Sequence, residues 1–501
     1  MAVHKVLGIE TEFGIVVRGV ADSNPVTASS LLINAYVGDL ERQRAAGPAV
    51  GWDFEDETPG NDARGPEGPA SPPEVETHLV NAVLTNGARY YVDHAHPELS
   101  TPECADARAV VVWDRAAEEI IRLSMVAANR ILPEGQELVV HKNNSDGKGN
   151  SYGCHENYLM ARSVPFGKVV SHATAHFISR QLYTGSGKIG SEAAGLGIAQ
   201  VPYQLTQRAD FFEAEVGLET TLKRPIVNTR DEPHCDAQKY RRLHVITGDA
   251  NRSETATFLK VGTTAMVLAM VEDGALERTF TFRNPVGAMR QVSYDLELTR
   301  PLELVDGTTV TALDVQGELL ASAQAWAESR GLDAVGGDEV GKTILQEWEH
   351  VLSGLQADPS SVADRVDWVA KHRILTAYQQ RHDLEWGDPR LGALALQYHD
   401  LRPERSLADR AGLVRMVGEE EVRRAMTEPP TDTRAYFRGR CLQRWAAQVV
   451  AANWDSIVFD VGESALRRVP MMEPMRGTAK HVGTVLDESA DPADLLARLS
   501  D

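Results

Sequence analysis

The sequence contains few of the residues that cross-link a small or secreted domain. Only four of its 501 residues are cysteines, and no two of them form a CxxC pair. A structural zinc site or a disulfide framework needs paired thiols, so we predict neither and expect a reducing compartment. The four cysteines are Cys104, Cys154, Cys235 and Cys441.

Long hydrophobic runs are missing too. No apolar run reaches the roughly 18 residues that a membrane-spanning helix needs. The first residues, MAVHKVLGIETEFG, turn acidic by residue 10 and contain no apolar core of a signal peptide. We therefore expect a cytoplasmic protein without a membrane partner.

Positive charge is in short supply. The chain has 51 Lys and Arg against 72 Asp and Glu, a formal net charge of −21. This excess argues against a nucleic-acid partner held by bulk electrostatics. The 43% hydrophobic and 25% charged residues are ordinary for a globular enzyme, and 501 residues exceed what one core usually serves, so two or three domains are expected.

The stretch RYYVDHAHPELSTPE, which begins at Arg89, combines charged side chains with a strand pattern. Side chains two residues apart on a strand share a face, so Arg89, Tyr91 and Asp93 should point together. Glu98 follows Pro97, which should end regular strand pairing. A carboxylate near an arginine suits a hard cation that bridges to phosphate oxygens. A surface strand with solvated charges is the alternative.

Two further segments carry potential metal ligands. In GIETEFG, Glu10 and Glu12 share one strand face, where they repel each other unless a cation or water lies between them. The Gly-rich loop NNSDGKGNSYG leads into CHENYLMAR, a predicted strand with His155 and Asn157 on one face. A single strand histidine is usually an ordinary core or surface residue, but other candidate ligands are scarce here.

The segment from Ala46 to Glu74 differs in composition from its surroundings. It is dominated by Gly, Pro and acidic residues, and Arg64 is its only basic residue. Such a segment buries too little apolar surface to offset the entropy lost on ordering. We predict a long mobile insertion outside the core and near the site entrance, because it precedes the Arg89 strand. Trp52 and Phe54 either dock transiently or belong to a plain surface loop.

A polar block between residues 201 and 254 gathers arginines in an otherwise acidic chain. Its densest part is VNTRDEPHCDAQKYRRLHVITGDANRSE. Guanidinium groups match phosphates and carboxylates, so the block predicts anion recognition, with a solvated basic face as the alternative. The residues concerned are Arg208, Asn228, Arg230, Arg241, Arg242, His244, Asn251 and Arg252.

Most of the remaining chain has a helical pattern. An Asp306-Gly307 turn predicts a hairpin in the strand-like run from Phe280 to Thr311. A last compact unit begins near residue 430, so we predict a domain over residues 1–430 and a small mixed α/β domain over residues 431–501. The spacing of apolar residues predicts helices over Asp106 to Leu132, Ala256 to Glu272 (amphipathic), Ala312 to Arg330 and Gly341 to His382.

Four elements of the chain together resemble a known family. They are GIETEFG, RYYVDHAHPE, the Gly-rich loop before CHEN, and NTRDEPH…RRLH…GDANRSE. In this order they resemble the carboxylate–amine ligase superfamily with the glutamine synthetase fold, and most closely the enzymes of prokaryotic ubiquitin-like protein (Pup). That family contains a Pup ligase and a Pup deamidase that is also a depupylase. The insertion and the spacing DHAHPE are similar to the deamidase branch, because the ligase lacks the insertion and has one more residue between its aspartate and glutamate.

The resemblance implies an α+β fold and a nucleotide site. A curved antiparallel β-sheet cradle, backed by helices, would hold ATP and magnesium within residues 1–430, with the acidic insertion near the active site. Asp93 matches the essential aspartate, as nucleophile or as base. The implied metal ligands are Glu10, Tyr91, Glu98, His155 and Glu12. The implied nucleotide contacts are Arg89, Thr101, Trp454, Arg230, Arg242 and His244. The implied substrate contacts are Arg208 and Asn228.

The implied activity is hydrolysis at the C-terminus of Pup. In the deamidase branch, the site converts the C-terminal glutamine of Pup to glutamate and cleaves the isopeptide bond between Pup and a lysine of a pupylated protein. The implied partners are Pup, pupylated proteins and the proteasomal ATPase pathway, and the implied cofactors are Mg²⁺ with ATP, or ADP plus phosphate. The alternatives are the ligase reaction, a small-molecule glutamate–amine ligase and an inactive nucleotide-binding scaffold.

Overall fold

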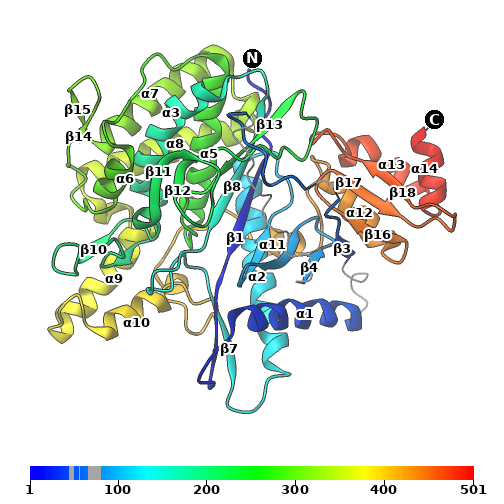
Figure 1. Ribbon diagram of the computed structural model, residues 1–501, viewed down its shortest axis with the longest axis horizontal. Helices are drawn as coiled ribbons and strands as arrows, with labels where there is room; N and C mark the ends of the chain where they lie inside the picture. Colours follow the sequence, from blue (N-terminus) through cyan, green and yellow to red (C-terminus); the bar gives the residue numbers. More distant parts are fainter. Residues whose placement is uncertain (44–49, 56, 66–79, 501) are drawn as a thin grey trace.

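One ten-stranded sheet runs through the computed structural model, which describes residues 1–43, 50–55, 57–65 and 80–500 (Figure 1). All neighbouring strands are antiparallel except β3 and β16, which are parallel. In spatial order the strands are β13 (Tyr240–Val245), β8 (Cys154–Ala161), β1 (Leu7–Glu12), β6 (His96–Ser100), β5 (Arg89–Asp93), β4 (Asn81–Val83), β3 (Val50–Trp52), β16 (Val449–Ala452), β17 (Ser456–Phe459) and β18 (Arg467–Pro470).

The register of this sheet brings together polar positions that alternate along separate strands. Glu12 lies opposite Glu98 across β1 and β6, and Glu10 lies opposite His155 across β1 and β8. Tyr91 lies opposite Glu98 across β5 and β6. Residues directly opposite each other on antiparallel strands share a face, so these side chains occupy one face of the sheet. Pro97 lies inside β6 and does not end it, contrary to the prediction.

Helices cover the opposite face of the central strands. The alternate residues of β1, Leu7 and Ile9, pack into the main hydrophobic core with residues of the covering helices. The sheet therefore has an apolar back and a polar front, as the alternation predicts. The helices whose residues share this core include α2 (Ala107–Asn129), α3 (Phe166–Ser179), α4 (Gln181–Thr184), α5 (Glu254–Asp273), α7 (Ala312–Arg330) and α8 (Gly337–Ala357).

Helix α5 is not the amphipathic helix that was predicted. It is long and apolar enough to cross a membrane by length and composition, but its most apolar window is 100% buried inside the protein. A helix that is surrounded on all sides needs apolar or small residues all round. Gly262 is one of them, because a Cβ there would lie 2.8 Å from Ile344 Cγ1.

The run from Phe280 to Thr311 is only partly strand-like. A hairpin forms around Asp306 and Gly307, as predicted, but α6 (Pro285–Ser293) precedes it. Asn284 caps this helix and Pro285 occupies its first turn, a start signal that the strand prediction overlooked. The smaller strands are β2 (Gly14–Arg18), β7 (Glu137–His141), β9 (Lys188–Ile189), β10 (Tyr203–Gln204), β11 (Phe212–Gly217), β12 (Arg224–Asn228), β14 (Leu302–Glu303) and β15 (Thr309–Val310).

The remaining helices surround this core. The predicted helical stretch from Gly341 to His382 is divided between α8 and α9. The α-helices are α1 (Pro25–Gln43), α9 (Asp367–His382), α10 (Pro389–Gln397) and α11 (Glu419–Ala425). The 3-10 helices are η1 (Ala209–Phe211), η2 (Asp333–Val335), η3 (Pro359–Val362) and η4 (Ala408–Arg410).

The C-terminal unit continues the main sheet. It contains β16, β17 and β18 together with α12 (Ala435–Trp445), α13 (Ala479–Glu488) and α14 (Pro492–Ser500), and it lies at one side of the molecule (Figure 1). Its hydrophobic core also includes Val50, Trp52 and Val83 from the N-terminal part of the chain. The unit is therefore joined to the rest through a shared sheet and a shared core.

Strand β3 departs from the prediction that the whole segment from Ala46 to Glu74 stays outside the core. It pairs with β4 on one side and with β16 on the other. Trp52 is buried and packs edge-to-face on Trp454, with ring centroids 5.2 Å apart. Residues 46–49, 56 and 66–74 lie outside the described part of the chain, so the prediction for them is not addressed.

Substitutions at two adjacent residues of β3 test whether this strand is paired within the sheet. Val50→Asp would put an unpaired carboxylate into the core of the C-terminal unit and should lower the free energy of unfolding by roughly 3 kcal/mol. The matched control is Gly51→Ala, whose Cβ would meet nothing within 4 Å and should change stability by less than about 0.5 kcal/mol. Chemical denaturation measures both. An unchanged stability for Val50→Asp would contradict the pairing of β3.

Candidate active site

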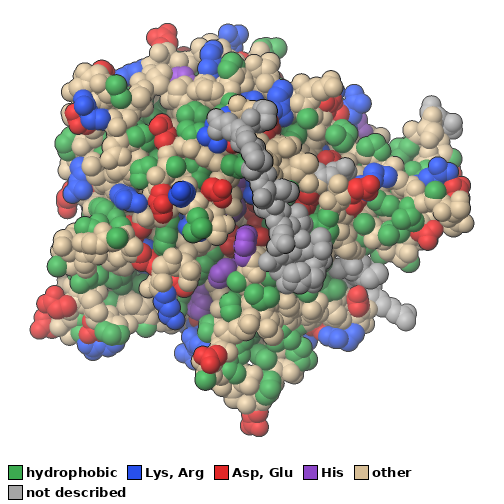
Figure 2. Space-filling model, viewed as in Figure 1, with side chains coloured by type: hydrophobic (Ala, Val, Ile, Leu, Met, Phe, Trp, Pro, Cys, Tyr) green, Lys and Arg blue, Asp and Glu red, His purple; other side chains and the backbone are tan. Residues whose placement is uncertain are grey.

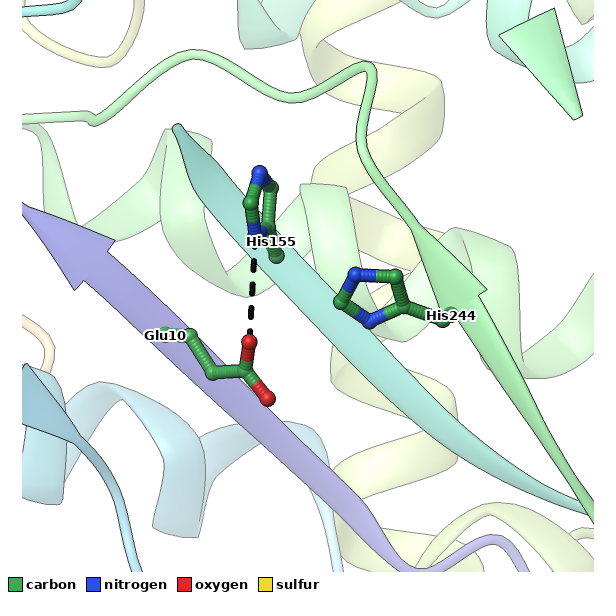
Figure 3. Close-up of side chains that lie close together, drawn as sticks. All are labelled: Glu10, His155 and His244. Atoms are coloured by element: carbon green, nitrogen blue, oxygen red, sulfur yellow. Dashed lines mark ion pairs between the residues drawn. The ribbon is translucent and has the colours of Figure 1, made fainter. Parts of the chain in front are cut away.

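The polar front of the sheet carries two groups of potential metal ligands. Within each group the ligand atoms lie within 4.8 Å of one another. His155 stands between the groups, because its Nδ1 is 3.7 Å from Glu10 Oε2 and its Nε2 is 4.0 Å from Glu12 Oε1. Figure 3 shows how β1, β8 and β13 turn the first group toward one point. The groups are Glu10, His155 and His244, and Glu12, Asp93 and Glu98.

The second group concentrates negative charge in a buried place. Glu98 is only 2% exposed. Burial, together with the neighbouring carboxylates of Asp93, Glu12 and Glu10, raises the pKa of Glu98 well above its ordinary value. Ionised carboxylates at this separation need a cation between them or must take up a proton.

In the first group, neighbouring side chains of the protein balance the negative charge of Glu10. Burial alone would raise the pKa of Glu10, but the nearby imidazoles of His155 and His244 and the charge of Arg242 hold it well below its ordinary value. Asn157 Nδ2 also donates to Glu10 Oε1 at 2.8 Å. Arg242 NH1 in turn donates to Asn157 Oδ1 at 2.7 Å, and the guanidinium lies 3.7 Å from Glu10.

Both groups suit a divalent cation. Carboxylate oxygens are the ligands that Mg²⁺ prefers, and an imidazole can complete such a set. The five predicted metal ligands gather here, since Glu10, Glu12, Glu98 and His155 belong to the groups and Tyr91 lies opposite Glu98. His244, which was expected to contact the nucleotide, stands with the first group, and Asp93 with the second.

Arg89 is held between aromatic rings beside these carboxylates. Its guanidinium carbon lies 3.9 Å from the ring centroid of Trp52 and 4.0 Å from that of Tyr91. Its Nε donates to Asn81 Oδ1 at 3.0 Å, and its NH1 lies 3.8 Å from Glu57 Oε1. A stacked guanidinium in a fixed orientation is a suitable ligand for phosphate oxygens.

Two adjoining cavities extend from these groups. Both are lined by Glu10, His234, Arg242 and Trp454, so they form one cleft. The first cavity is also lined by apolar residues such as Ile9 and Leu159, and by the charged residues Glu103 and Arg434. The second has a volume of about 510 Å³ and contains the predicted residues Arg89, Tyr91, Asp93, Glu98, His155, Arg230 and His244. Histidine and acidic side chains gather in the middle of the face shown in Figure 2.

Three residues that were predicted to contact the nucleotide or the substrate do not all line the cleft. Thr101 lines the first cavity, where its Oγ1 accepts a hydrogen bond from Ile9 N at 3.1 Å. Arg208 is 1% exposed and donates to the Ile246 carbonyl, and burial lowers its pKa to about 10. Asn228 donates to the carbonyls of Leu218 and Glu219. In the described part of the chain, neither Arg208 nor Asn228 is among the residues that line the cleft.

Several residues of the cleft were not predicted from the sequence. Glu57 accepts a hydrogen bond from Trp52 Nε1 at 2.6 Å, and burial raises its pKa. His94 Nδ1 lies 3.0 Å from Asp93 Oδ2, and His94 has a left-handed backbone with φ of 51°. A tryptophan followed by acids in a polar segment, and a histidine beside the candidate aspartate, are the signals that could have indicated them.

Comparison with known proteins identifies the family of this chain. The family described as Pup-ligase protein matches residues 5–458. This chain belongs to the Pup-ligase family. Its relatives include a depupylase of Acidothermus cellulolyticus, 50% identical and covering 99% of each chain, and a Pup deamidase/depupylase of Mycolicibacterium smegmatis, 44% identical over 99% of this chain and 100% of the relative. A Pup–protein ligase of Kineococcus radiotolerans is 40% identical over 83% of this chain and 94% of the relative.

Solved structures of the Pup-ligase family confirm the predicted fold. The Pup ligase PafA in complex with Pup superposes with a TM-score of 0.79 at 29% identity, covering 97% of this chain and 91% of that one. PafA in complex with ADP gives a TM-score of 0.71 at 33% identity, covering 81% and 89%. The curved antiparallel sheet backed by helices is therefore the family architecture.

Crowding of carboxylates should destabilise the protein when no divalent cation is present. The raised pKa of Glu98 means that the folded state binds a proton at this carboxyl more tightly than the unfolded state does, so its contribution to stability falls as pH rises above the unfolded pKa of about 4.3. At pH 7.5 without Mg²⁺, Glu98→Gln should therefore raise the free energy of unfolding by about 1 kcal/mol or more.

The same variant should respond less to added Mg²⁺, which stabilises a folded state that binds it. Thermal unfolding with and without Mg²⁺ measures both effects. The control is Glu339→Gln, which removes an exposed carboxylate from α8 and should change neither. A Glu98→Gln variant that is less stable than wild type without Mg²⁺ would contradict the repulsion.

Proposed function

We propose that this protein is a hydrolase that deamidates the C-terminal glutamine of Pup to glutamate and cleaves the isopeptide bond between Pup and lysines of pupylated proteins. The observation that carries the proposal is the pattern of relatives. Proteins named depupylase or Pup deamidase/depupylase match this chain over 99% of its length at 44–50% identity, whereas a Pup–protein ligase matches 83% of it at 40%. The extra coverage favours hydrolysis over ligation.

The cleft supports a Mg-nucleotide as cofactor, either ATP or ADP with phosphate. The relative PafA was solved with ADP. In this chain, the cavity beside Trp454 suits a base, and the guanidinium of Arg89 suits phosphates next to the two ligand groups. Glu10, Glu12, Tyr91, Glu98 and His155 would hold the Mg²⁺. The partners are Pup and pupylated proteins, and the compartment is the cytoplasm.

Asp93 is the residue that we assign to the chemical step. Burial alone would raise its pKa, but the hydrogen bond and charge of His94 lower it, so the carboxylate is ionised at neutral pH. As a base, it would accept a proton from water while the water oxygen attacks the amide carbonyl. As a nucleophile, its own oxygen would attack and form an anhydride that water then opens.

The other charged groups of the cleft stabilise the reacting carbonyl. When the carbonyl is attacked, negative charge develops on its oxygen, and fixed cations nearby lower the energy of that state. Mg²⁺ held by the ligand groups of the cleft would supply positive charge when bound. Arg230 and Arg242 line the same cavity and would orient the phosphates and the glutamyl carboxylate. The amine leaves as ammonia or as the substrate lysine, which takes up the proton.

The Asp93→Asn variant tests the role of Asp93 in the chemical step separately from any role in folding. The amide keeps the shape of the side chain but can neither accept a proton nor attack, so deamidation should fall by about 10²-fold or more. Thermal unfolding and ATP binding should stay close to wild type. Asp22→Asn makes the same chemical change at an exposed turn and should retain full activity. A near-normal rate for Asp93→Asn would remove this residue from the mechanism.

One assay tests the direction of the reaction. Purified protein is mixed with a pupylated protein and Mg²⁺, with either ATP or ADP plus phosphate. We expect free protein to be released in both mixtures, because isopeptide hydrolysis is already favourable in water and needs no stoichiometric ATP. Growth of the conjugate band with one ATP consumed per bond would instead identify a ligase. No change in either direction would favour the inactive scaffold.

A further inference from the structure

Glu103 lies just beyond β6 and faces the C-terminal unit. Its carboxylate accepts hydrogen bonds from Arg434 Nε at 2.7 Å and from Arg438 NH1 at 3.2 Å, and Arg438 NH2 binds its second oxygen. Its own carbonyl accepts a hydrogen bond from Thr433 Oγ1 at 2.7 Å. One residue that follows the main sheet thus binds the start of α12 through three side chains.

Arg438 also contacts the wall of the proposed nucleotide cavity. The side chain is fully buried. Its NH1 donates to the carbonyl of Trp454 at 3.2 Å, and its guanidinium lies 5.1 Å from the indole centroid. Its NH2 donates to the carbonyl of Gly87 at 2.9 Å, two residues before Arg89. Arg438 therefore contacts both the proposed base-binding residue and the turn that leads into the phosphate-binding strand.

Arg434 contacts a third segment of the cleft wall. Its NH1 donates to the carbonyl of His234 at 2.7 Å and to that of Met471 at 2.8 Å. His234 lines both cavities of the cleft and has a left-handed backbone with φ of 48°. A non-glycine residue in this conformation costs free energy, so the surrounding contacts must hold it in place.

The cluster of Glu103, Arg434 and Arg438 is strongly ionic. Burial alone would raise the pKa of Glu103, but the two guanidiniums outweigh it and lower the pKa to about 2. Removing the carboxylate charge would leave two buried cations without their partner, and such groups move toward water or other acceptors. The carbonyls of Trp454, Gly87 and His234 would then lose the donors that fix their positions.

We propose that Glu103 is a positioning residue for the nucleotide. Through Arg438 and Arg434 it sets the relative positions of three wall segments, from the β4–β5 turn, the polar block and the C-terminal unit. The proposal rests on the proposed function, because it assumes that a nucleotide binds beside Trp454. It adds that affinity for the nucleotide depends on a carboxylate that lines the first cavity and acts through two arginines.

The first test compares two carboxylate-to-amide variants of the full-length protein. Calorimetry with Mg·ATP should show Glu103→Gln binding about tenfold more weakly than wild type, the scale of coupling between groups in contact. The matched control is Glu421→Gln. Glu421 also accepts two hydrogen bonds from one arginine, Arg108, at 2.7 and 2.8 Å, but this pair joins α2 to α11 away from the cleft. The control should bind Mg·ATP as wild type does.

The second test asks whether Glu103 acts through Trp454. In a Trp454→Ala background, adding Glu103→Gln should weaken Mg·ATP binding by only about threefold, because the ring that Arg438 positions is already absent and only the other two wall segments respond. A general loss of stability would instead weaken binding equally in both backgrounds. A full tenfold loss in the Trp454→Ala background would overturn the positioning role.

A third variant keeps the proposal testable if Glu103→Gln does not fold. Glu103→Asp retains the charge on a shorter side chain, so its affinity for Mg·ATP should lie between those of wild type and the amide variant, with kcat at saturating nucleotide nearly unchanged. Wild-type affinity in the folded Glu103→Gln or Glu103→Asp variant would refute the proposal. If wild-type protein bound no nucleotide, the proposed function itself would fail, which is a separate outcome.

Discussion

Repulsion among carboxylates on one face of the sheet is the constraint on which the rest of this structure depends. Glu10, Glu12, Asp93 and Glu98 lie within two adjoining groups, and the most buried of them has its pKa raised by the others. Such a site opposes folding, so it persists only on a scaffold that stabilises it from elsewhere. The apolar back of β1, packed against a large helical core, provides that scaffold.

The cleft is assembled from segments that are far apart in the chain. The N-terminal strands supply the carboxylates, β8 and β13 supply histidines, and the C-terminal unit supplies Trp454. Strand β3 makes this assembly continuous, because it pairs with β4 on one side and β16 on the other. Glu103 reinforces the same junction with ion pairs to α12. The cleft can therefore span two units that share one sheet and one hydrophobic core.

Much of the site could be predicted from local pattern. Alternation along single strands placed Arg89, Tyr91 and Asp93 together, and the three do line one cavity. The same reasoning failed where burial is complete or where a polar segment finds an apolar partner. Helix α5 was expected to be amphipathic, but nearly all of its residues are buried. Its own sequence does not reveal that other helices surround it on all sides. Val50 and Trp52 were placed in a mobile insertion, because the core in which both are buried belongs largely to a unit nearly 400 residues later.

The sequence by itself determined the polar and apolar faces of the strands, the excess of negative charge and the family, because each depends on residue types at short spacing. Only the tertiary structure decided which strands are neighbours. Pairing between β1 and β6 or between β3 and β16 joins distant segments, and local periodicity carries no information about such partners. It also separated Arg208 and Asn228, which bind backbone carbonyls and do not themselves line the cleft, from Arg242, which lines it. All three have the same polar sequence context, and only burial and distance distinguish them.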